Sequence, residues 1–270
     1  MGTMMTELSA SVLIELDGVF AYLTLNRPQK RNALSLQMLK ELTAALRAVG
    51  ANPQVQVVIL KANGSVFSAG HDLSEMLDCT PPAYRTLFAA CTETMETIQK
   101  INQPVIAQVQ GPATAAGCQL VASCDLAVAA DSAWFATPGV KIGLFCSTPM
   151  VAVSRNIGRK KMMEMLLTGD SVSATEALAL GLVNKVVGPE QLEAATRDLA
   201  RKIAVSSAYI VSIGKQAFYK QIELPQHEAY EYAEKVMARN AEAADAHEGI
   251  SAFLQKRAAN WKGKPKQQDA

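Results

Sequence analysis

The chemistry that this sequence favours depends on backbone amides more than on ionisable side chains. Residues 104–125 read PVIAQVQGPATAAGCQLVASCD, an apolar run followed by a Gly111-Pro112 turn and small residues that predict the start of a helix. Such a helix leaves its first N–H groups unpaired and directed at one point. That point can hold an anion or a developing oxyanion, and small side chains let a ligand reach the backbone. No Asp, Glu, His or Lys occurs in the stretch before Asp125, so no proton-transfer group is expected beside it.

A second loop of similar design strengthens this interpretation. The sequence FSAGHDL (residues 67–73) also follows a predicted buried strand. Two such loops at adjacent strand ends can each supply one N–H to a single carbonyl oxygen, as a thioester enolate requires. The loop at residues 111–117 is neither a dinucleotide nor a phosphate loop, because it lacks G-x-G-x-x-G, Pro112 has no N–H, and no Lys-Ser/Thr pair follows.

Strands and helices that alternate along the chain must position these loops. Residues 12–15 and 19–26 predict two strands joined by an Asp17-Gly18 hairpin turn, and Ser35 caps a helix that ends at Gly50. A nearly continuous apolar run over residues 55–61 is typical of a strand buried on both faces. Further elements are predicted at residues 87–98 (helix), 105–109 (strand), 117–123 (helix) and 125–129 (strand).

Beyond Met150 the pattern predicts helices only. One of them begins with a capping box, Ser173 to Glu176, and stops at Gly181. Alternating strands and helices with short connections are typical of βαβ crossovers. We therefore predict an α/β core over residues 1–195 and a helical C-terminal region over residues 196–270.

Composition and charge exclude several classes of protein. Of the 270 residues, 49% are hydrophobic and 19% are charged, which allows a large buried core and is unlike a disordered chain. The net charge is +1, and the only basic cluster is the short Lys-rich end (262–266), so nucleic-acid binding is not expected. No apolar run is long enough to span a bilayer and no targeting segment is evident, so we expect a protein without a membrane partner.

The cysteines and histidines predict neither a disulfide framework nor a metal site. Five cysteines, an odd number, lie mostly among apolar residues without a CxxC pair, which predicts reduced thiols in a cytoplasmic protein. His227 begins an HExx string, but Glu231 stands where a zinc peptidase has its second histidine. We expect no metal and no permanently bound cofactor. The cysteines are Cys79, Cys91, Cys118, Cys124 and Cys146.

The chain closely resembles the enoyl-CoA hydratase/isomerase (crotonase) family. The matches run in the family's order from about residue 12 to residue 260, and together they are specific although each is short. They are NRPQKRNAL (26–34), FSAGHDL (67–73), PVIAQVQG (104–111), GCQL (117–120), CDLA (124–127), FATPG (135–139), LTGD (167–170), GLV (181–183) and AFLQKR (252–257). The resemblance implies a crotonase-like spiral of ββα units, a helical C-terminal trimerisation region that forms a homotrimer or a dimer of trimers, and coenzyme A thioesters of fatty acid metabolism as substrate or ligand.

The same resemblance assigns roles to individual residues. The backbone N–H groups of His71 and Ala116 would form the oxyanion hole, and the His71 side chain is expected to face solvent. The remaining assignments concern coenzyme A: Ala69, Asp72, Leu73 and Ser74 would line its channel, Lys30 or Arg31 would reach its phosphates, and Phe253 and Lys256 would lie near its adenine and phosphate. For Lys256 a solvated lysine is an equal alternative.

Two departures from the family pattern bear on the chemistry. Family hydratases have glutamates where this chain has Gln119 and Gly139, and these glutamates activate water and exchange the α-proton of the substrate. An amide does not titrate and glycine has no side chain, while general acid–base catalysis contributes on the order of 10²–10⁴-fold. The resemblance therefore implies acyl-CoA binding, with hydration weak or absent.

Three functional classes remain open at this stage. The hole can serve another reaction, such as decarboxylation or thioester hydrolysis. Glu75 or Asp78 can replace the missing acids in hydration or isomerisation. The protein can also be a non-catalytic acyl-CoA binder. A thiol at Cys146 and an ammonium at Lys141 are expected to be structural and solvated, respectively.

Overall fold

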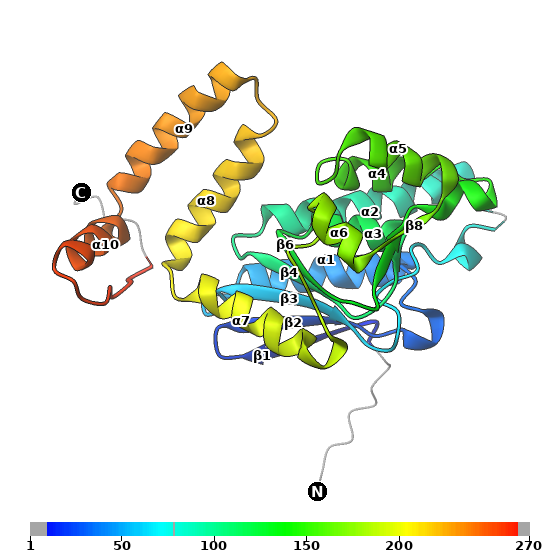
Figure 1. Cartoon of the computed structure of the whole chain (residues 1–270), viewed down its shortest axis with the longest axis horizontal. Coiled ribbons are helices and arrows are strands. Elements are labelled where there is room, and N and C mark those ends of the chain that lie inside the picture. The colour runs from blue at the N-terminus through cyan, green and yellow to red at the C-terminus, as the bar shows by residue number, and fades with distance from the viewer. Residues whose placement is uncertain (1–9, 78, 264–270) are drawn as a thin grey trace, which may run out of the picture.

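A single sheet organises the core of the protein, which a computed structural model describes over residues 10–77 and 79–263. The sheet has six strands in the order β1-β2-β3-β4-β6-β9 (Figure 1). The hairpin β1–β2 is antiparallel, and every other pair is parallel. The strands are β1 (Val12–Asp17), β2 (Phe20–Leu25), β3 (Val57–Ala62), β4 (Val105–Val109), β6 (Leu126–Ala130) and β9 (Lys185–Val187).

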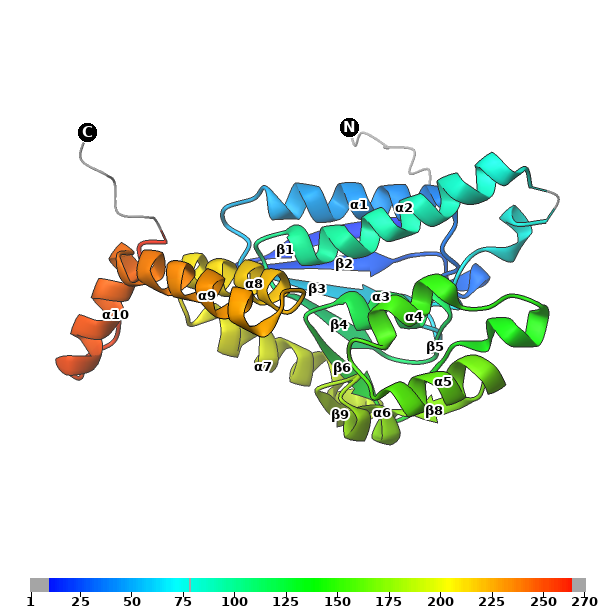
Figure 2. The ribbon, with the colours of Figure 1, turned by 90° about the horizontal axis from the view of Figure 1, so that it is seen from above.

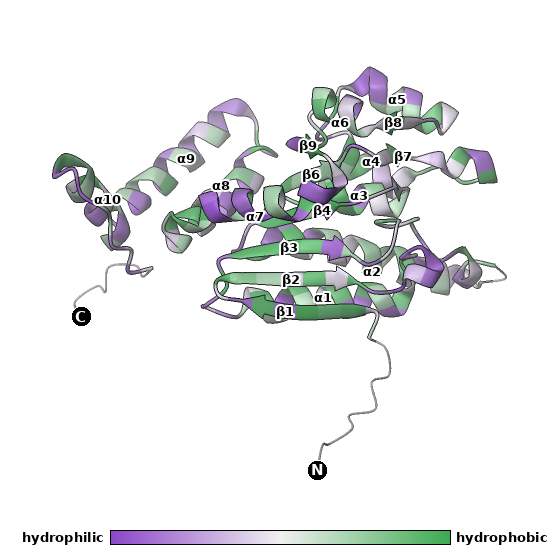
Figure 3. Cartoon of the chain, turned by 60° about the horizontal axis from the view of Figure 1, so that its bottom comes forward, coloured by the Kyte–Doolittle hydropathy of each residue, from purple (hydrophilic) through white to green (hydrophobic). Residues whose placement is uncertain are grey.

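The alternation of side chains along each strand produces a core on either face of the sheet. Along β2, Leu23 and Leu25 enter the larger core, whereas Phe20 and Tyr22 enter the smaller one. Because a strand between two cores is buried on both faces, its residues are apolar almost continuously. Figure 3 shows this for β2 and β3. The larger core is covered by α1 (Leu36–Gly50), α2 (Pro81–Lys100) and α3 (Ala116–Ser123), and the smaller by α7 (Leu192–Ala204).

A smaller sheet completes the core. Its order is β5-β7-β8, with β5 parallel to β7 and β7 antiparallel to β8. Its strands are β5 (Ala113–Thr114), β7 (Trp134–Ala136) and β8 (Ser171–Ser173), and the helices around it are α4 (Ser147–Val153), α5 (Arg159–Thr168) and α6 (Ala174–Leu180). Short 3₁₀ turns lie at Pro28–Lys30, Leu73–Glu75, Pro138–Ile142 and Pro189–Gln191.

Three C-terminal helices extend away from this core as an arm (Figures 1 and 2). They are α8 (Ala208–Gln221), α9 (Gln226–Ala241) and α10 (Ala244–Leu254). Lys215 fastens α8 to the core, because its buried ammonium lies 2.7 Å from the Asp125 carboxylate and donates to the carbonyls of Ile98 and Gln103, each at 2.8 Å. Removing one partner of such a buried pair would leave an uncompensated charge.

The predicted α/β core and helical C-terminal region are confirmed, with local caps as expected. The Ser35 side chain accepts a hydrogen bond from the Met38 amide, and Ser173 forms a capping box with Glu176. Gly181 ends that helix in the left-handed conformation, at φ 85°. Across the described ranges no helix is long and apolar enough to cross a membrane.

The prediction of helices only beyond Met150 is wrong, because β8 and β9 lie there. Strands of three residues at sheet edges are too short to show a period of two in the sequence, and only their tertiary partners define them. The predicted boundary at residue 195 falls inside α7, which packs on the large sheet through Leu192, Ala195 and Ala200. The arm itself begins at Ala208.

Candidate active site

The two glycine-containing loops predicted to meet do lie against each other. The Phe67 and Ser68 amides donate to the Pro112 carbonyl at 3.0 and 3.2 Å, and the Thr114 amide donates to the Ser68 carbonyl at 2.9 Å. Two glycines permit this approach. A Cβ atom at Gly117 would overlap the Ser68 carbonyl, and one at Gly70 would lie 2.9 Å from the Ala115 Cβ.

The loops leave two amides unpaired. His71 lies between two backbone hydrogen bonds: the Leu34 N–H donates to the Gly70 carbonyl at 2.7 Å, and the Asp72 N–H donates to the Leu34 carbonyl at 3.3 Å. The N–H of His71 itself donates to no group in the part of the chain that is described. Ala116 opens α3, so its N–H has no partner in the preceding turn. Both residues line one cavity. These are the two residues whose N–H groups the family resemblance assigns to an oxyanion hole.

The backbone of Ala115, the residue before Ala116, is strained. Ala115 precedes α3 with φ 50° and ψ −119°, a conformation that residues other than glycine rarely adopt. Such a conformation costs on the order of 1–3 kcal/mol and persists only where surrounding structure enforces it. Here the Ala115 N–H is held by the Ala136 carbonyl at 2.9 Å, which fixes the peptide that turns into α3.

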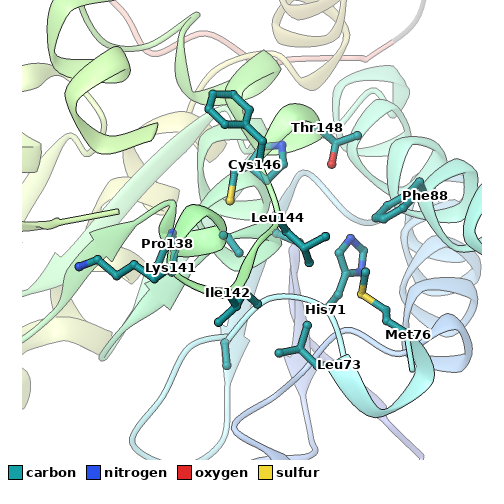
Figure 4. A pocket seen from close by; sticks show the side chains of 16 residues that line it. His71, Leu73, Met76, Phe88, Pro138, Lys141, Ile142, Leu144, Cys146 and Thr148 are labelled. Atoms are coloured by element: carbon teal, nitrogen blue, oxygen red, sulfur yellow. The ribbon is translucent and has the colours of Figure 1, made fainter. Parts of the chain in front are cut away.

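The cavity has a volume of about 330 Å³ and is mostly apolar (Figure 4). In residues 10–77 and 79–263 no Asp or Glu lines it, and its titratable side chains are His71, Lys141 and Cys146. The ammonium of Lys141 points away from the cavity and pairs with Asp170 at 2.9 Å. Besides these three residues the lining consists of Ala69, Leu73, Met76, Phe88, Ala115, Ala116, Pro138, Gly139, Ile142, Leu144, Phe145, Thr148 and Pro149.

Gln119 and Gly139 occupy the positions where, by resemblance, family hydratases have glutamates, and neither places an acid in the cavity. Gln119 is buried and does not line the cavity, and its Oε1 lies 3.8 Å from Cys91 Sγ, which donates to it. Burial raises the pKa of the Cys91 thiol to about 12, so this thiol remains a donor. Gly139 does line the cavity, but a Cβ there would lie 2.8 Å from the Leu144 carbonyl oxygen and 2.9 Å from Cys146 Sγ. The turn at 144–146 thus occupies the space of a side chain at residue 139.

His71 contradicts one expectation. Its side chain is mostly enclosed and lines the cavity beside Phe88 (Figure 4). The two rings meet edge to face, with centroids 5.4 Å apart. Burial lowers the pKa of the imidazole, with a hydrogen bond to Leu34 and the charge of Glu75 acting in the opposite direction. An ionisable group therefore does stand beside the unpaired amides, a fact that the segment 104–125 alone could not reveal.

The residues assigned to a coenzyme A channel divide into two groups. Ala69 and Leu73 line the cavity. Asp72 and Ser74 instead bond to one another, with Ser74 Oγ donating to Asp72 Oδ1 at 2.6 Å, and Asp72 pairs with Arg27 at 3.1 Å. The hydrogen bond from Ser74, and then Arg27, holds the pKa of the Asp72 carboxyl below its usual value.

The other assigned residues lie outside the cavity lining. Lys30 and Arg31 are exposed in the turn beside the 67–72 loop, where the Ala69 amide donates to the Arg31 carbonyl at 3.0 Å. Phe253 belongs to α10, and Lys256 lies two residues beyond the last residue of that helix, Leu254. That helix lies at the opposite end of the molecule from α4 (Figures 1 and 2). One chain does not bring these two residues to its own cavity.

Of the candidate replacement acids, Glu75 does not line the cavity. Glu75 Oε2 accepts a hydrogen bond from the Leu36 amide at 2.8 Å, at the start of α1. Asp78 lies outside the described residues. Cys146 lines the cavity with a thiol whose pKa is raised by burial, and Ser147 Oγ donates to the Phe145 carbonyl. No group of three or more potential metal ligands occurs in the described ranges.

Comparison with known proteins places the chain in a family. The Enoyl-CoA hydratase/isomerase family model matches residues 15–264, and the chain belongs to this family. It is 49% identical over 240 residues to a Mus musculus protein named enoyl-CoA hydratase domain-containing protein 3, mitochondrial, covering 88% of this chain and 80% of the relative.

Two crystal structures agree with this assignment. The human enoyl-CoA hydratase domain-containing protein 3 has a TM-score of 0.91 at 46% identity and covers 93% of this chain and 100% of its own. An enoyl-CoA hydratase from Mycobacterium smegmatis has a TM-score of 0.91 at 49% identity and covers 93% and 98%. The predicted family and crotonase fold are confirmed.

The prediction of a cytoplasmic protein is contradicted. The relatives from Mus musculus, Danio rerio and Homo sapiens are all named as mitochondrial proteins, which points to a mitochondrial setting. Free cysteines indicate only a reducing environment, so they could not distinguish between compartments.

Restoring a side chain at residue 139 is expected to strain the site. We expect Gly139→Ala to lower the free energy of unfolding by about 1–3 kcal/mol, because the new methyl group overpacks the 144–146 turn. In a Cys146→Ala background the loss should shrink, since one of the two contacts is removed. Denaturant titration of the four proteins in this cycle measures both effects, and equal losses in the two backgrounds would contradict this account of the turn.

Proposed function

We propose that this protein binds acyl-CoA thioesters and polarises their carbonyl with the backbone amides of His71 and Ala116. The single observation that carries the proposal is that two residues from separate loops, each with an N–H that is unpaired within the described residues, line one apolar cavity. Backbone donors of this kind stabilise the oxyanion of a thioester enolate, and each is worth about 3–4 kcal/mol in a transition state. The ligand's acyl chain would occupy the apolar cavity beyond them.

The position of coenzyme A follows from the same placement. Ala69 and Leu73 would flank the thioester end, and exposed Lys30 and Arg31 lie on the adjoining turn, where they can meet phosphates. No permanently bound cofactor is needed for this binding, since coenzyme A arrives as part of the ligand.

Binding should depend on the thioester carbonyl. We expect butyryl-CoA to bind more tightly than the matching thioether, S-butyl-CoA, by about 1–3 kcal/mol, because each donor contributes about 0.5–1.5 kcal/mol net to a ground-state complex. Isothermal titration calorimetry with acetyl-, butyryl-, crotonyl- and longer-chain CoA esters measures this difference. Absence of binding across the whole panel would rule the function out. Equal affinity for thioester and thioether would show that the two amides do not bind the carbonyl.

Ordinary hydration of enoyl-CoA is proposed to be weak or absent. Hydration needs a group that activates water and one that protonates the α-carbon, and this chain has Gln119 and Gly139 where the family glutamates stand. Loss of such general acid–base catalysis is worth on the order of 10²–10⁴-fold in rate. Among the open alternatives, replacement by Glu75 is disfavoured because its carboxylate is committed to the start of α1.

A spectrophotometric assay with crotonyl-CoA tests this point. We expect turnover at least about 10²-fold below that of an enzyme with both glutamates, measured under the same conditions. Glu75→Gln should leave the residual rate unchanged. Hydration at the rate of the comparison enzyme would refute the proposal, and abolition of a measurable rate by Glu75→Gln would assign the chemistry to that carboxylate instead.

We also propose that the arm joins copies of the chain into a homotrimer or a dimer of trimers. Its support is the number of large apolar side chains that a single chain leaves exposed on α8–α10 and the turns that follow them. They are Phe218, Ile222, Tyr230, Met237, Ile250, Phe253 and Leu254. Exposed apolar surface of this extent is typical of protein–protein contacts. A neighbouring copy could also bring Phe253 and Lys256 to the coenzyme A site.

Sedimentation equilibrium tests the assembly. We expect a mass of three or six chains for the wild type, and a shift toward monomer for Phe253→Glu/Leu254→Glu because buried carboxylates oppose the contact. Ile14→Glu, a matched change on the exposed face of β1, should leave the mass unchanged. A monomeric wild type at micromolar concentration would refute the assembly.

A further inference from the structure

The helices α9 and α10 of the arm bury very little apolar surface in a single chain. Of their residues, all of which lie in the described ranges, only Asp245 and Ala252 are buried. A helix of 11 residues such as α10 is marginal in isolation, so its place depends on contacts with other elements. Because one of its two buried residues carries a carboxylate, polar contacts have to supply much of what apolar packing does not.

Asp245, at the start of α10, has only 1% of its surface exposed. Its Oδ2 accepts hydrogen bonds from Ser207 Oγ and from the Gly263 amide, and its Oδ1 accepts one from the Lys262 amide at 2.7 Å. A buried carboxylate is costly unless donors surround it, and hydrogen bonds to an ionised group are roughly twice as strong as neutral ones. This side chain therefore joins α10, the serine that caps α8, and the chain that follows α10.

The chain that follows α10, residues 256–263, is bound to that helix by a second acid. We call this segment the strap. Arg257 donates to both carboxylate oxygens of Glu248 on α10, at 2.6 and 2.9 Å, and the Asn260 amide donates to the same side chain at 2.8 Å. Figure 1 shows the strap running back from α10 toward the start of α8.

Trp261 connects the strap to two helices at once. Its indole N–H donates to the Val205 carbonyl at the end of α7, at 2.7 Å. Its ring lies against α10, where a Cβ atom at Gly249 would be 3.1 Å from it. The strap thus lies between the α7–α8 junction and α10 and is bound to both, so it fixes the direction of α10.

We propose that Asp245 is a positioning residue for the assembly of copies of this chain. By binding the strap and Ser207 together, it holds α10 in the orientation in which a second copy meets that helix. This inference rests on the proposed assembly through the arm. It assigns a buried carboxylate far from the cavity to the formation of the contact between copies.

The exposed side chains of α10 explain why its orientation matters. Ile250, Phe253 and Leu254 are 60%, 82% and 74% exposed, so they are available to a neighbouring copy. A contact costs less conformational entropy when the helix that forms it is already fixed. With the strap released, α10 would have to be ordered at each association, and the assembly would be weaker.

Hydrogen exchange followed by mass spectrometry tests the role of Asp245 in holding the strap. We expect Asp245→Asn to speed exchange of the Lys262 and Gly263 amides on the order of 10-fold, because an NH₂ group replaces one accepting oxygen and bonds to a charged group are lost. Glu242→Gln, a change at an exposed carboxylate at the end of α9, should exchange like the wild type. Unchanged strap exchange in Asp245→Asn would overturn the inference.

Sedimentation equilibrium measures the consequence for assembly. We expect the dissociation constant of the assembly to rise on the order of 10-fold in Asp245→Asn, since α10 is no longer fixed beforehand. Circular dichroism should show unchanged helix content, and Glu242→Gln should assemble like the wild type. Faster strap exchange with an unchanged dissociation constant would overturn the positioning role.

The Phe253→Glu/Leu254→Glu protein separates this inference from the proposed assembly. Neither change touches a strap contact, so we expect strap exchange at the wild-type rate even where this protein dissociates. Loss of strap protection in it would show that the neighbouring copy holds the strap, and would overturn the inference. A wild type that is monomeric would refute the proposed assembly and the positioning role with it, whatever the rate of strap exchange.

Discussion

The close approach of two backbones is the constraint on which the rest of the site depends. The loop after β3 and the loop before α3 bond to each other through Ser68, Pro112 and Thr114. At Gly70 and Gly117 a single methyl group would push them apart. Their contact places the His71 and Ala116 amides at one cavity and is maintained at the expense of strain at Ala115. The large sheet supplies the rigid frame, because the strands leading to both loops are buried on both faces.

Under the proposed function, the cavity beyond these amides keeps one element of a family site, the backbone donors, and lacks another, the acid–base side chains. Backbone donors are insensitive to side-chain identity, so the proposed oxyanion hole requires only that the two loops fold in the same way. The acid–base positions have no such protection. Here the 144–146 turn fills the space beside Gly139, and Gln119 is buried away from the cavity. Membership of the enoyl-CoA hydratase/isomerase family therefore establishes the fold, while the chemistry depends on which side chains line the cavity.

The C-terminal arm bears on whether one chain can form the whole proposed site. Lys215 and its carboxylate partner Asp125 fix α8 to the core at a buried ion pair, so the direction in which the arm leaves is set by the fold. Beyond that anchor, α9 and α10 have few contacts with the core and expose apolar side chains. A single chain thus supplies the residues proposed to bind the thioester, whereas Phe253 and Lys256, which are assigned to adenine and phosphate, lie far from that cavity.

The sequence by itself determined the larger elements, their caps and the two loops, because these follow from local periodicity, hydrogen-bonding side chains and residue identity. It could not define β8 and β9, whose three residues acquire strand geometry only from their neighbours. It also placed the His71 side chain in solvent, since nothing local indicates on which side of its loop the ring lies. Only the tertiary structure, in which Phe88 of α2 and Leu144 close over that ring, decided that an imidazole lies beside the two amides.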